Sequence, residues 1–278
     1  MFDFIANIFG YLLNFLYEIL SNYGFAIIIF SILVKLLLLP LTIKQQKTME
    51  KTKKMQGELQ ALQFKYKNDP EKLQKEMMDL YKRENASPMS GCLSSIAQLV
   101  LILAVFFLVK SPLTYMKKVE ANIIKEYTDK IETKTNYPEV EIIREFGKEN
   151  EEIYINMEFL GLDLSSIPSS DMSDFKTFII PVLYVVSSII SMKMTMNMQN
   201  NGKDKNKKKE KGEESPEDIM QSTSKSMSYM MPVMAFSISL VAPLGLALYW
   251  LMSNVLMIVE RVFLNVIKSK KEKKEDLA

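Results

Sequence analysis

Long apolar segments alternate with strongly charged segments along this chain, and this alternation is its most regular pattern. A helix that crosses a lipid bilayer needs about 20 predominantly apolar residues. Five segments approach or reach that length, so we predict an all-α polytopic membrane protein with five transmembrane helices. The predicted helices cover residues 22–43, 89–109, 175–195, 227–241 and 243–266, with a tight turn at Ala242-Pro243 between the last two.

The first 21 residues predict a helix of another kind. Apolar residues dominate from Phe2 to Leu20, and no Lys or Arg occurs before residue 19, so the basic region of a cleavable signal peptide is missing. We predict that residues 1–21 form an amphipathic helix in the membrane interface, because a further crossing would conflict with the orientation given below.

Residues 44–88 predict a charged helical hairpin. Asn68-Asp69-Pro70 separates its two arms, with Asp69 as the N-cap and Pro70 as the first helical residue of the second arm. Packing of one arm on the other accounts for all of its regularly spaced apolar positions. These follow spacings of three and four at Met55, Leu59, Leu62 and Tyr66 in the first arm and at Leu73, Met77 and Leu80 in the second.

The distribution of charge predicts the orientation. Residues 44–87 hold eleven Lys and Arg against seven acids, residues 199–225 hold seven Lys, and the tail from Lys268 holds five, whereas residues 110–174 hold eight against fourteen. The positive-inside rule therefore places the hairpin, a Lys-rich loop at 196–226 and a basic tail at 267–278 in the cytoplasm. It places the N-terminus and the 110–174 loop outside. We expect the Lys-rich tract and the tail to be disordered.

Composition narrows the available chemistry. The 278 residues are 48% hydrophobic, with 35 Lys and Arg, 33 Asp and Glu, no His, and a single cysteine, Cys92. These counts exclude His-based catalysis, His metal sites and an internal disulfide, and no phosphate-binding glycine loop or nucleophile motif is present. We therefore predict that the protein is not an enzyme and has no cofactor.

One lysine lies in the middle of the first predicted span. Lys35 is nine residues from Lys44, about 13 Å along a helix, too deep for its side chain to reach the interface comfortably. A charge at the centre of a bilayer costs about 2.5–3.5 kcal/mol on insertion scales. The sequence therefore predicts that Lys35 faces a hydrated cavity open to the cytoplasm.

Polar residues of the other spans are candidates to line this cavity. Such residues also join neighbouring helices in membranes, at about 0.6 kcal/mol each, and that alternative applies to the whole set. Glu260 is the one acid in a predicted span, and we expect it to pair with the adjacent Arg261 rather than with Lys35. The candidate lining residues are Ser94, Gln98, Ser187, Ser191, Tyr249, Trp250, Ser253 and Asn254.

Three stretches resemble the YidC/Oxa/Alb family of membrane protein insertases, in its short bacterial form. They are residues 32–41 followed by Lys44-Gln45, the run Pro88-Met89-Ser90-Gly91-Cys92, and Pro243 to Trp250 with Ser253-Asn254. The resemblance implies a hydrophilic groove in the bacterial plasma membrane that inserts, folds and helps assemble membrane proteins without nucleotide hydrolysis. The family's groove cation, usually Arg, corresponds to Lys35.

The resemblance also implies partners. Nascent membrane proteins would be the substrates, lipids would surround the protein, and the Sec translocon, the ribosome and signal-recognition targeting factors are further candidates, whereas DNA is not. The basic tail is as well explained by attraction to lipid headgroups as by contact with ribosomal RNA. Two other functions stay open, a transporter with an anion site at Lys35 and a scaffold for cytoplasmic proteins.

The predicted orientation can be tested with single cysteines in a variant that lacks Cys92. Cysteines within residues 44–87 should react only with reagents that cross the membrane, because the positive-inside rule retains this hairpin in the cytoplasm. Cysteines within residues 113–174 should react with impermeant maleimides added to intact cells. The reverse labelling pattern would contradict the orientation.

Overall fold

The computed structural model describes residues 2–84, 90–132, 135–170, 172–200, 230 and 232–275. These residues are mostly helical, with one short antiparallel pair of strands. The elements are α1 (Phe2–Leu20), α2 (Tyr23–Lys65), α3 (Pro70–Arg83), α4 (Ser90–Lys110), η1 (Leu113–Lys117), α5 (Ala121–Thr128), α6 (Pro138–Phe146), η2 (Gly147–Glu149), β1 (Glu158–Phe159), β2 (Leu162–Asp163), η3 (Phe175–Phe178), α7 (Ile179–Asn200), the helix Pro232–Val241, and α9 (Leu244–Glu275).

The prediction of an all-α polytopic membrane protein is confirmed. Within the described part, four segments are long and apolar enough to cross a bilayer, Asp3–Leu20, Tyr23–Thr48, Phe175–Met196 and Leu244–Val266. Two shorter apolar helices, Leu99–Lys110 and Pro232–Val241, lie at the second and fourth predicted spans. Length and composition do not decide whether Asp3–Leu20 crosses the membrane, so its interfacial position stays a prediction.

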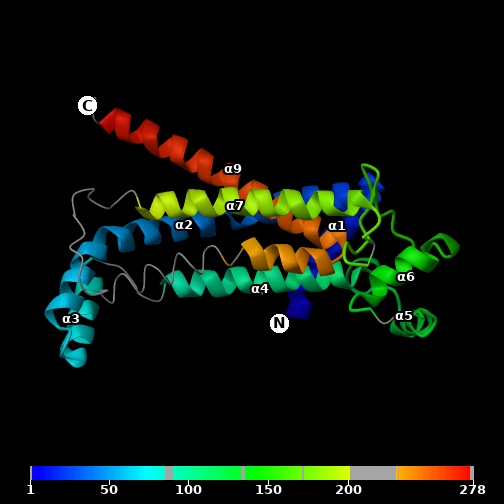
Figure 1. Cartoon of the computed structure of the whole chain (residues 1–278), viewed down its shortest axis with the longest axis horizontal. Coiled ribbons are helices and arrows are strands. Elements are labelled where there is room, and N and C mark those ends of the chain that lie inside the picture. Colours follow the sequence, from blue (N-terminus) through cyan, green and yellow to red (C-terminus); the bar gives the residue numbers. More distant parts are fainter. Residues whose placement is uncertain are drawn as a thin grey trace.

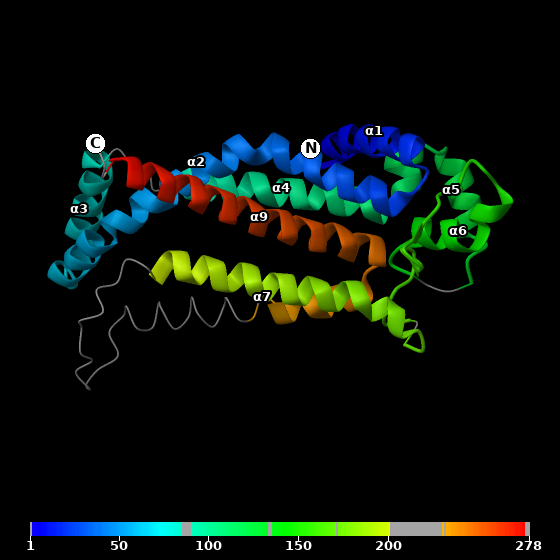
Figure 2. The same cartoon turned by 90° about the horizontal axis from the view of Figure 1, so that it is seen from above.

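The long helices run alternately up and down. Helices α2, α7 and α9 all lead from the end of the molecule that carries α5 and α6 toward the end that carries α3 (Figures 1 and 2). Helices α4 and Pro232–Val241 run the opposite way. This alternation matches five successive crossings by α2, α4, α7, Pro232–Val241 and α9.

At two boundaries predicted from the sequence, the composition changes but the helix continues. Helix α2 continues for 43 residues through Pro40, so the first span and the first arm of the hairpin form one helix. Helix α9 continues to Glu275, so the expectation of a disordered tail is wrong for residues 268–275, and residues 276–278 lie outside the described residues. The Lys-rich tract from Gly202 to Gly212 lies outside the described residues.

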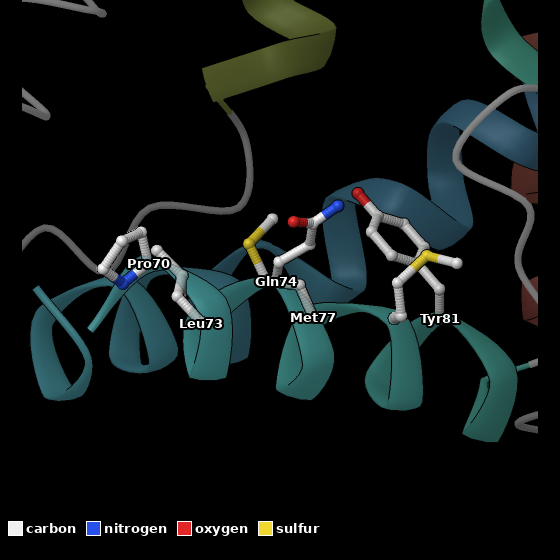
Figure 3. Close-up of a pocket in the computed structure, with 6 residues that line it drawn as sticks. Pro70, Leu73, Gln74, Met77 and Tyr81 are labelled. Atoms are coloured by element: carbon white, nitrogen blue, oxygen red, sulfur yellow. The ribbon is translucent and has the colours of Figure 1, made fainter.

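The hairpin has the predicted cap. The backbone N–H of Lys72 donates to the side chain of Asp69 at 3.0 Å, and Pro70 opens α3, as the sequence predicted. Met55 of the first arm and Leu80 of the second are buried. A hollow of about 280 Å3 opens along one side of α3 (Figure 3). Pro70, Leu73, Gln74, Met77, Met78 and Tyr81 line it. The first arm of the hairpin therefore covers only part of the apolar face of α3.

The hydrophobic core is concentrated at the opposite end of the molecule. There α1, the first turns of α2 and α9, the end of α4, and residues 113–164 share one buried cluster. The closest approaches need glycine, since a Cβ on Gly24 would overlap the ring of Phe159 and one on Gly245 would press on Tyr23. In α2, no described side chain between residues 35 and 54 is buried.

Helix α1 has three distinct faces. Ala6, Phe9, Leu13 and Leu16 are buried against the core, whereas Phe4, Ile8, Tyr11, Phe15 and Ile19 form an exposed apolar stripe. The third face is polar and is tied to η1, where Tyr115 donates to Asp3 at 2.6 Å and Lys118 donates to Asn7. The bond to Asp3 raises the pKa of Tyr115 to about 12. A helix with protein, apolar and polar faces has the pattern that an interfacial helix requires.

Residues 110–174 form a small folded unit rather than an open loop. Glu139 is buried there and accepts hydrogen bonds from the Thr114 N–H at 2.9 Å and the Thr114 hydroxyl at 2.6 Å. Burial raises the pKa of the Glu139 carboxyl, and the hydrogen bonds from Thr114 oppose that rise. The carboxyl thus holds α6 to the start of η1.

Helix α1 and η1 are in close contact at Gly10. A Cβ at this position would collide with the backbone carbonyl of Tyr115. We expect Gly10→Ala to lower the stability by about 1–3 kcal/mol, the usual cost of overpacking, despite the better helix propensity of Ala. The measurement is thermal unfolding of the detergent-purified protein, followed by the fluorescence of its single tryptophan, Trp250.

Gly57→Ala is the matched control. Gly57 lies inside α2 with no atom within 4 Å of the added Cβ, so this change should raise stability by about 0.5–1 kcal/mol. An equal gain from Gly10→Ala would contradict the close contact between α1 and η1.

Candidate functional site

Helices α2 and α9 lie side by side in the same direction and bring two charged residues together. The Lys35 Nζ atom lies 2.6 Å from Oε2 of Glu260. The two side chains are unequally buried, with 24% of the Lys35 side chain exposed and only 5% of that of Glu260. The lysine is therefore the accessible member of a largely buried ion pair.

The expected pairing of Glu260 with Arg261 is wrong. Adjacent residues of a helix point in different directions, so they face different neighbours. Arg261 Nη1 donates to the backbone oxygen of Ser191 at 2.9 Å and to the Thr195 hydroxyl, both on α7. Neither carboxylate oxygen of Glu260 accepts a regular hydrogen bond from the described residues. The short contact with Lys35 is thus the interaction that compensates the burial of this carboxylate.

A polar seam joins α7 to α9, which we define by Ser187 and Ser191 on α7 and by Asn254, Met257 and Arg261 on α9. Asn254 Nδ2 lies 3.5 Å from the Ser187 hydroxyl, and the Ser191 hydroxyl lies 3.3 Å from the sulfur of Met257. Next to the seam, the ring of Trp250 packs 5.8 Å from that of Tyr184. These contacts are those of helix packing, the alternative that sequence analysis left open.

The predicted lining residues therefore fall into two groups. Trp250 and Asn254 of α9 face α7, where Ser187 and Ser191 lie. Tyr249 and Ser253 lie on the same helical face of α9 as Glu260, at spacings of four and seven, and Tyr249 is buried. Ser94 and Gln98 belong to α4, but their side chains lie outside the described residues. The structure does not bring the whole predicted set around Lys35.

Sequence reasoning gave Glu260 the wrong partner and missed the contacts of Arg261 with Ser191 and Thr195. A signal for the pairing of Glu260 with Lys35 existed, because Lys35 is the one charge within its apolar segment and Glu260 is the one acid within another. Ions placed in low dielectric are usually paired, so spatial pairing deserved more weight than adjacency in sequence. Arg261 and Thr195 become recognisable only once α7 and α9 are aligned.

Among the described residues, the site is an ion pair between a lysine and a carboxylate. No group of three or more His, Cys, Asp or Glu residues is arranged to hold a metal ion within the part of the chain that the structure describes. The lysine ammonium has three N–H donors, and Glu260 is its one described ion-pair partner.

The burial of this ion pair predicts that removal of one charge lowers the stability more than removal of both. Lys35→Met should lower the free energy of unfolding by about 3 kcal/mol, because it leaves Glu260 buried without a counter-charge. The double change Lys35→Met with Glu260→Met should recover most of that loss, because apolar pairs of similar volume replace buried ion pairs at little cost. Thermal unfolding of the purified variants measures both; additive losses in the double variant would contradict the pairing.

Comparison with known proteins gives a consistent result. The family described as 60Kd inner membrane protein matches residues 15–273. The protein named Membrane protein insertase YidC from Clostridium perfringens is 29% identical over 255 residues, which cover 92% of this chain and 83% of that protein. The protein of the same name from Treponema denticola is 26% identical over 94% of this chain but only 37% of its own length.

Higher identities extend over shorter regions. The insertase of that name from Fusobacterium nucleatum is 38% identical over 111 residues, 40% of this chain and 54% of that protein. The chain thus matches about half, or less, of several relatives. The matched family region nevertheless covers the helices α2, α4, α7 and α9 and the ion pair, and it confirms the family that the sequence motifs predicted. The chain belongs to the 60Kd inner membrane protein (YidC/Oxa/Alb) family.

Proposed function

We propose that this protein is a membrane protein insertase and chaperone of the bacterial plasma membrane. Its substrates would be newly made membrane proteins, whose polar tails cross the bilayer while their apolar segments pass into lipid. The observation that carries the proposal is Lys35, a partly exposed cation in the middle of a candidate span. The relatives named as insertases support the same function.

The packing of the bundle suits such a reaction. Buried residues are continuous from Ala242 to Tyr249 at the start of α9, but beyond them only Glu260 is buried among the described side chains of this helix. The half of the bundle that holds Lys35 is thus less densely packed than the half that holds the core. A hydrated groove in that half would shorten the roughly 30 Å of hydrocarbon that a polar tail must cross.

The energy for insertion would come from the substrate itself. Each buried CH2 group contributes about 0.8 kcal/mol when it leaves water, so an apolar segment of membrane-spanning length favours the inserted state strongly. Lys35 would contribute by attracting acidic residues of the tail into the groove. No nucleotide hydrolysis is required in this scheme.

The other residues take distinct parts in the proposal. Ser253 shares the Lys35 side of α9 and would face the substrate tail, as would Ser94 and Gln98 of α4. Tyr249 lies on the same side of α9 but is buried in the core. Ser187, Ser191, Trp250 and Asn254 would hold α7 against α9. The hairpin of α2 and α3 would lie in the cytoplasm, where targeting factors, the ribosome or the Sec translocon deliver substrates.

A depletion experiment tests the function and the role of the lysine together. In a bacterial strain depleted of its own insertase, this protein should restore insertion of a single-span reporter with an acidic N-terminal tail. Lys35→Ala should reduce that insertion about tenfold, equivalent to about 1.4 kcal/mol, and Lys35→Arg should retain it because the charge is kept. Reporters with neutral tails should be affected little.

Lys125→Ala is the matched control, because Lys125 is exposed on α5, away from the ion pair. Uniform loss across acidic and neutral tails in Lys35→Ala would point to misfolding. Equal rescue by wild type and Lys35→Ala would retain the insertase and remove the special role of Lys35. Failure of a well-expressed wild-type protein to rescue any reporter would contradict the proposed function and favour a transporter or a scaffold.

A further inference from the structure

The ion pair raises a question that the proposed function leaves open. A cation that attracts acidic tails should be available to them, yet Lys35 already has a carboxylate 2.6 Å away. Glu260 comes from this chain's own α9 and carries the same chemical group as the acidic residues of a substrate tail. The protein therefore supplies its own anion to the site where a substrate anion would bind.

Lys35 and Glu260 differ in how accessible their side chains are to a substrate. Glu260 lies behind the lysine, with 5% of its side chain exposed, whereas Lys35 retains 24%. A substrate carboxylate can approach the ammonium from the exposed side without displacing Glu260 from its buried position. Because the ammonium has three N–H donors, it can contact both carboxylates at once.

The interactions around Glu260 make it depend on Lys35. Both of its oxygens are buried without a regular hydrogen bond from the described residues, and the neighbouring Arg261 is directed to Ser191 and Thr195 on α7. The negative charge of Glu260 therefore has its direct contact with Lys35. It lowers the net charge that an approaching tail experiences, and it repels a second carboxylate at the same ammonium.

We propose that Glu260 is a specificity-determining residue, a built-in counter-ion that competes with acidic substrate tails for Lys35 and keeps their capture weak and reversible. This inference rests on the proposed function, since it concerns the same lysine. An insertase must release each tail after it has crossed, and a fully unpaired cation in low dielectric would retain an anion too strongly. With Glu260 in place, the ammonium keeps its resting partner when the tail leaves.

The test measures capture directly, with the full-length protein reconstituted in lipid vesicles. The probe is a synthetic single-span peptide with a glutamate-rich N-terminal tail and a photoreactive residue beside the glutamates. A twin peptide with glutamines in their place reports capture that does not depend on charge. The yield of crosslinked product is compared for wild type, Glu260→Gln and the control Glu120→Gln, which removes an exposed carboxylate at the start of α5.

We expect Glu260→Gln to increase capture of the glutamate-rich peptide about fivefold, equivalent to about 1 kcal/mol. Capture of the glutamine twin should not change, and Glu120→Gln should behave as wild type with both peptides. Equal capture of the acidic peptide by wild type and Glu260→Gln would overturn the inference while leaving the proposed function intact. No preference of the wild type for the acidic peptide would instead contradict the proposed role of Lys35, and the inference with it.

A charge exchange separates competition from simple helix pinning. The double variant Lys35→Glu with Glu260→Lys retains an ion pair between α2 and α9, so it should unfold at nearly the wild-type temperature. Its accessible position now carries a carboxylate, so its preference for the acidic peptide should be lost. If this variant captures the acidic peptide as the wild type does, the pair only pins the helices and the inference is wrong.

Glu260→Asp provides a second route if Glu260→Gln does not fold. The shorter side chain keeps the charge but withdraws it from Lys35, so capture of the acidic peptide should rise by a smaller factor than the fivefold expected for Gln. A decrease in capture with Glu260→Asp would also overturn the inference.

Discussion

The close packing at one end of the bundle is the constraint on which the rest of the structure depends. Helix α1, the first turns of α2 and α9, the end of α4 and the 110–174 unit share one core. Gly10, Gly24 and Gly245 permit contacts there that any side chain would disturb. Interiors packed at this density deform little. This end therefore fixes the positions from which the long helices extend.

The fixed end sets the register of the ion pair. Tyr23 of α2 lies against Gly245 of α9. From that level Lys35 is twelve residues along its helix and Glu260 is fifteen, about 18 Å and about 22 Å at 1.5 Å per residue. The long lysine side chain spans the remaining difference. A charge contact deep in the apolar region is thus positioned by packing at the far end, because no described side chain of α2 between Val34 and Met55 is buried.

Sequence predicted the features that depend on local interactions. The helices follow from apolar segments of sufficient length, and the Asp69 cap with Pro70 follows from backbone chemistry within four residues. Features built from distant residues were missed. The folded 110–174 unit is joined to the first helices by hydrogen bonds such as Asn22 to Glu158 and Asn156 to Tyr17. No spacing rule within one segment encodes such pairs. The partner of Glu260 was mistaken for the same reason, since the nearest cation in sequence points to another helix.

Two cations in the apolar part of the bundle illustrate how surroundings assign roles. Arg261 Nη1 is directed into the contact between α7 and α9, where a backbone carbonyl and a hydroxyl of α7 accept its hydrogen bonds. Its guanidinium group joins α9 to α7, and the planar arrangement of its N–H donors suits such a contact. Lys35 has Glu260 as its one described ion-pair partner, and part of its side chain is exposed. Within the proposed function, the Lys35 ammonium can share anions from its exposed side, whereas the arginine cannot do so without separating the helices that it joins. The two charges therefore differ in what surrounds them, because Arg261 contacts acceptors of α7 whereas Lys35 contacts a carboxylate of α9 and keeps part of its side chain exposed.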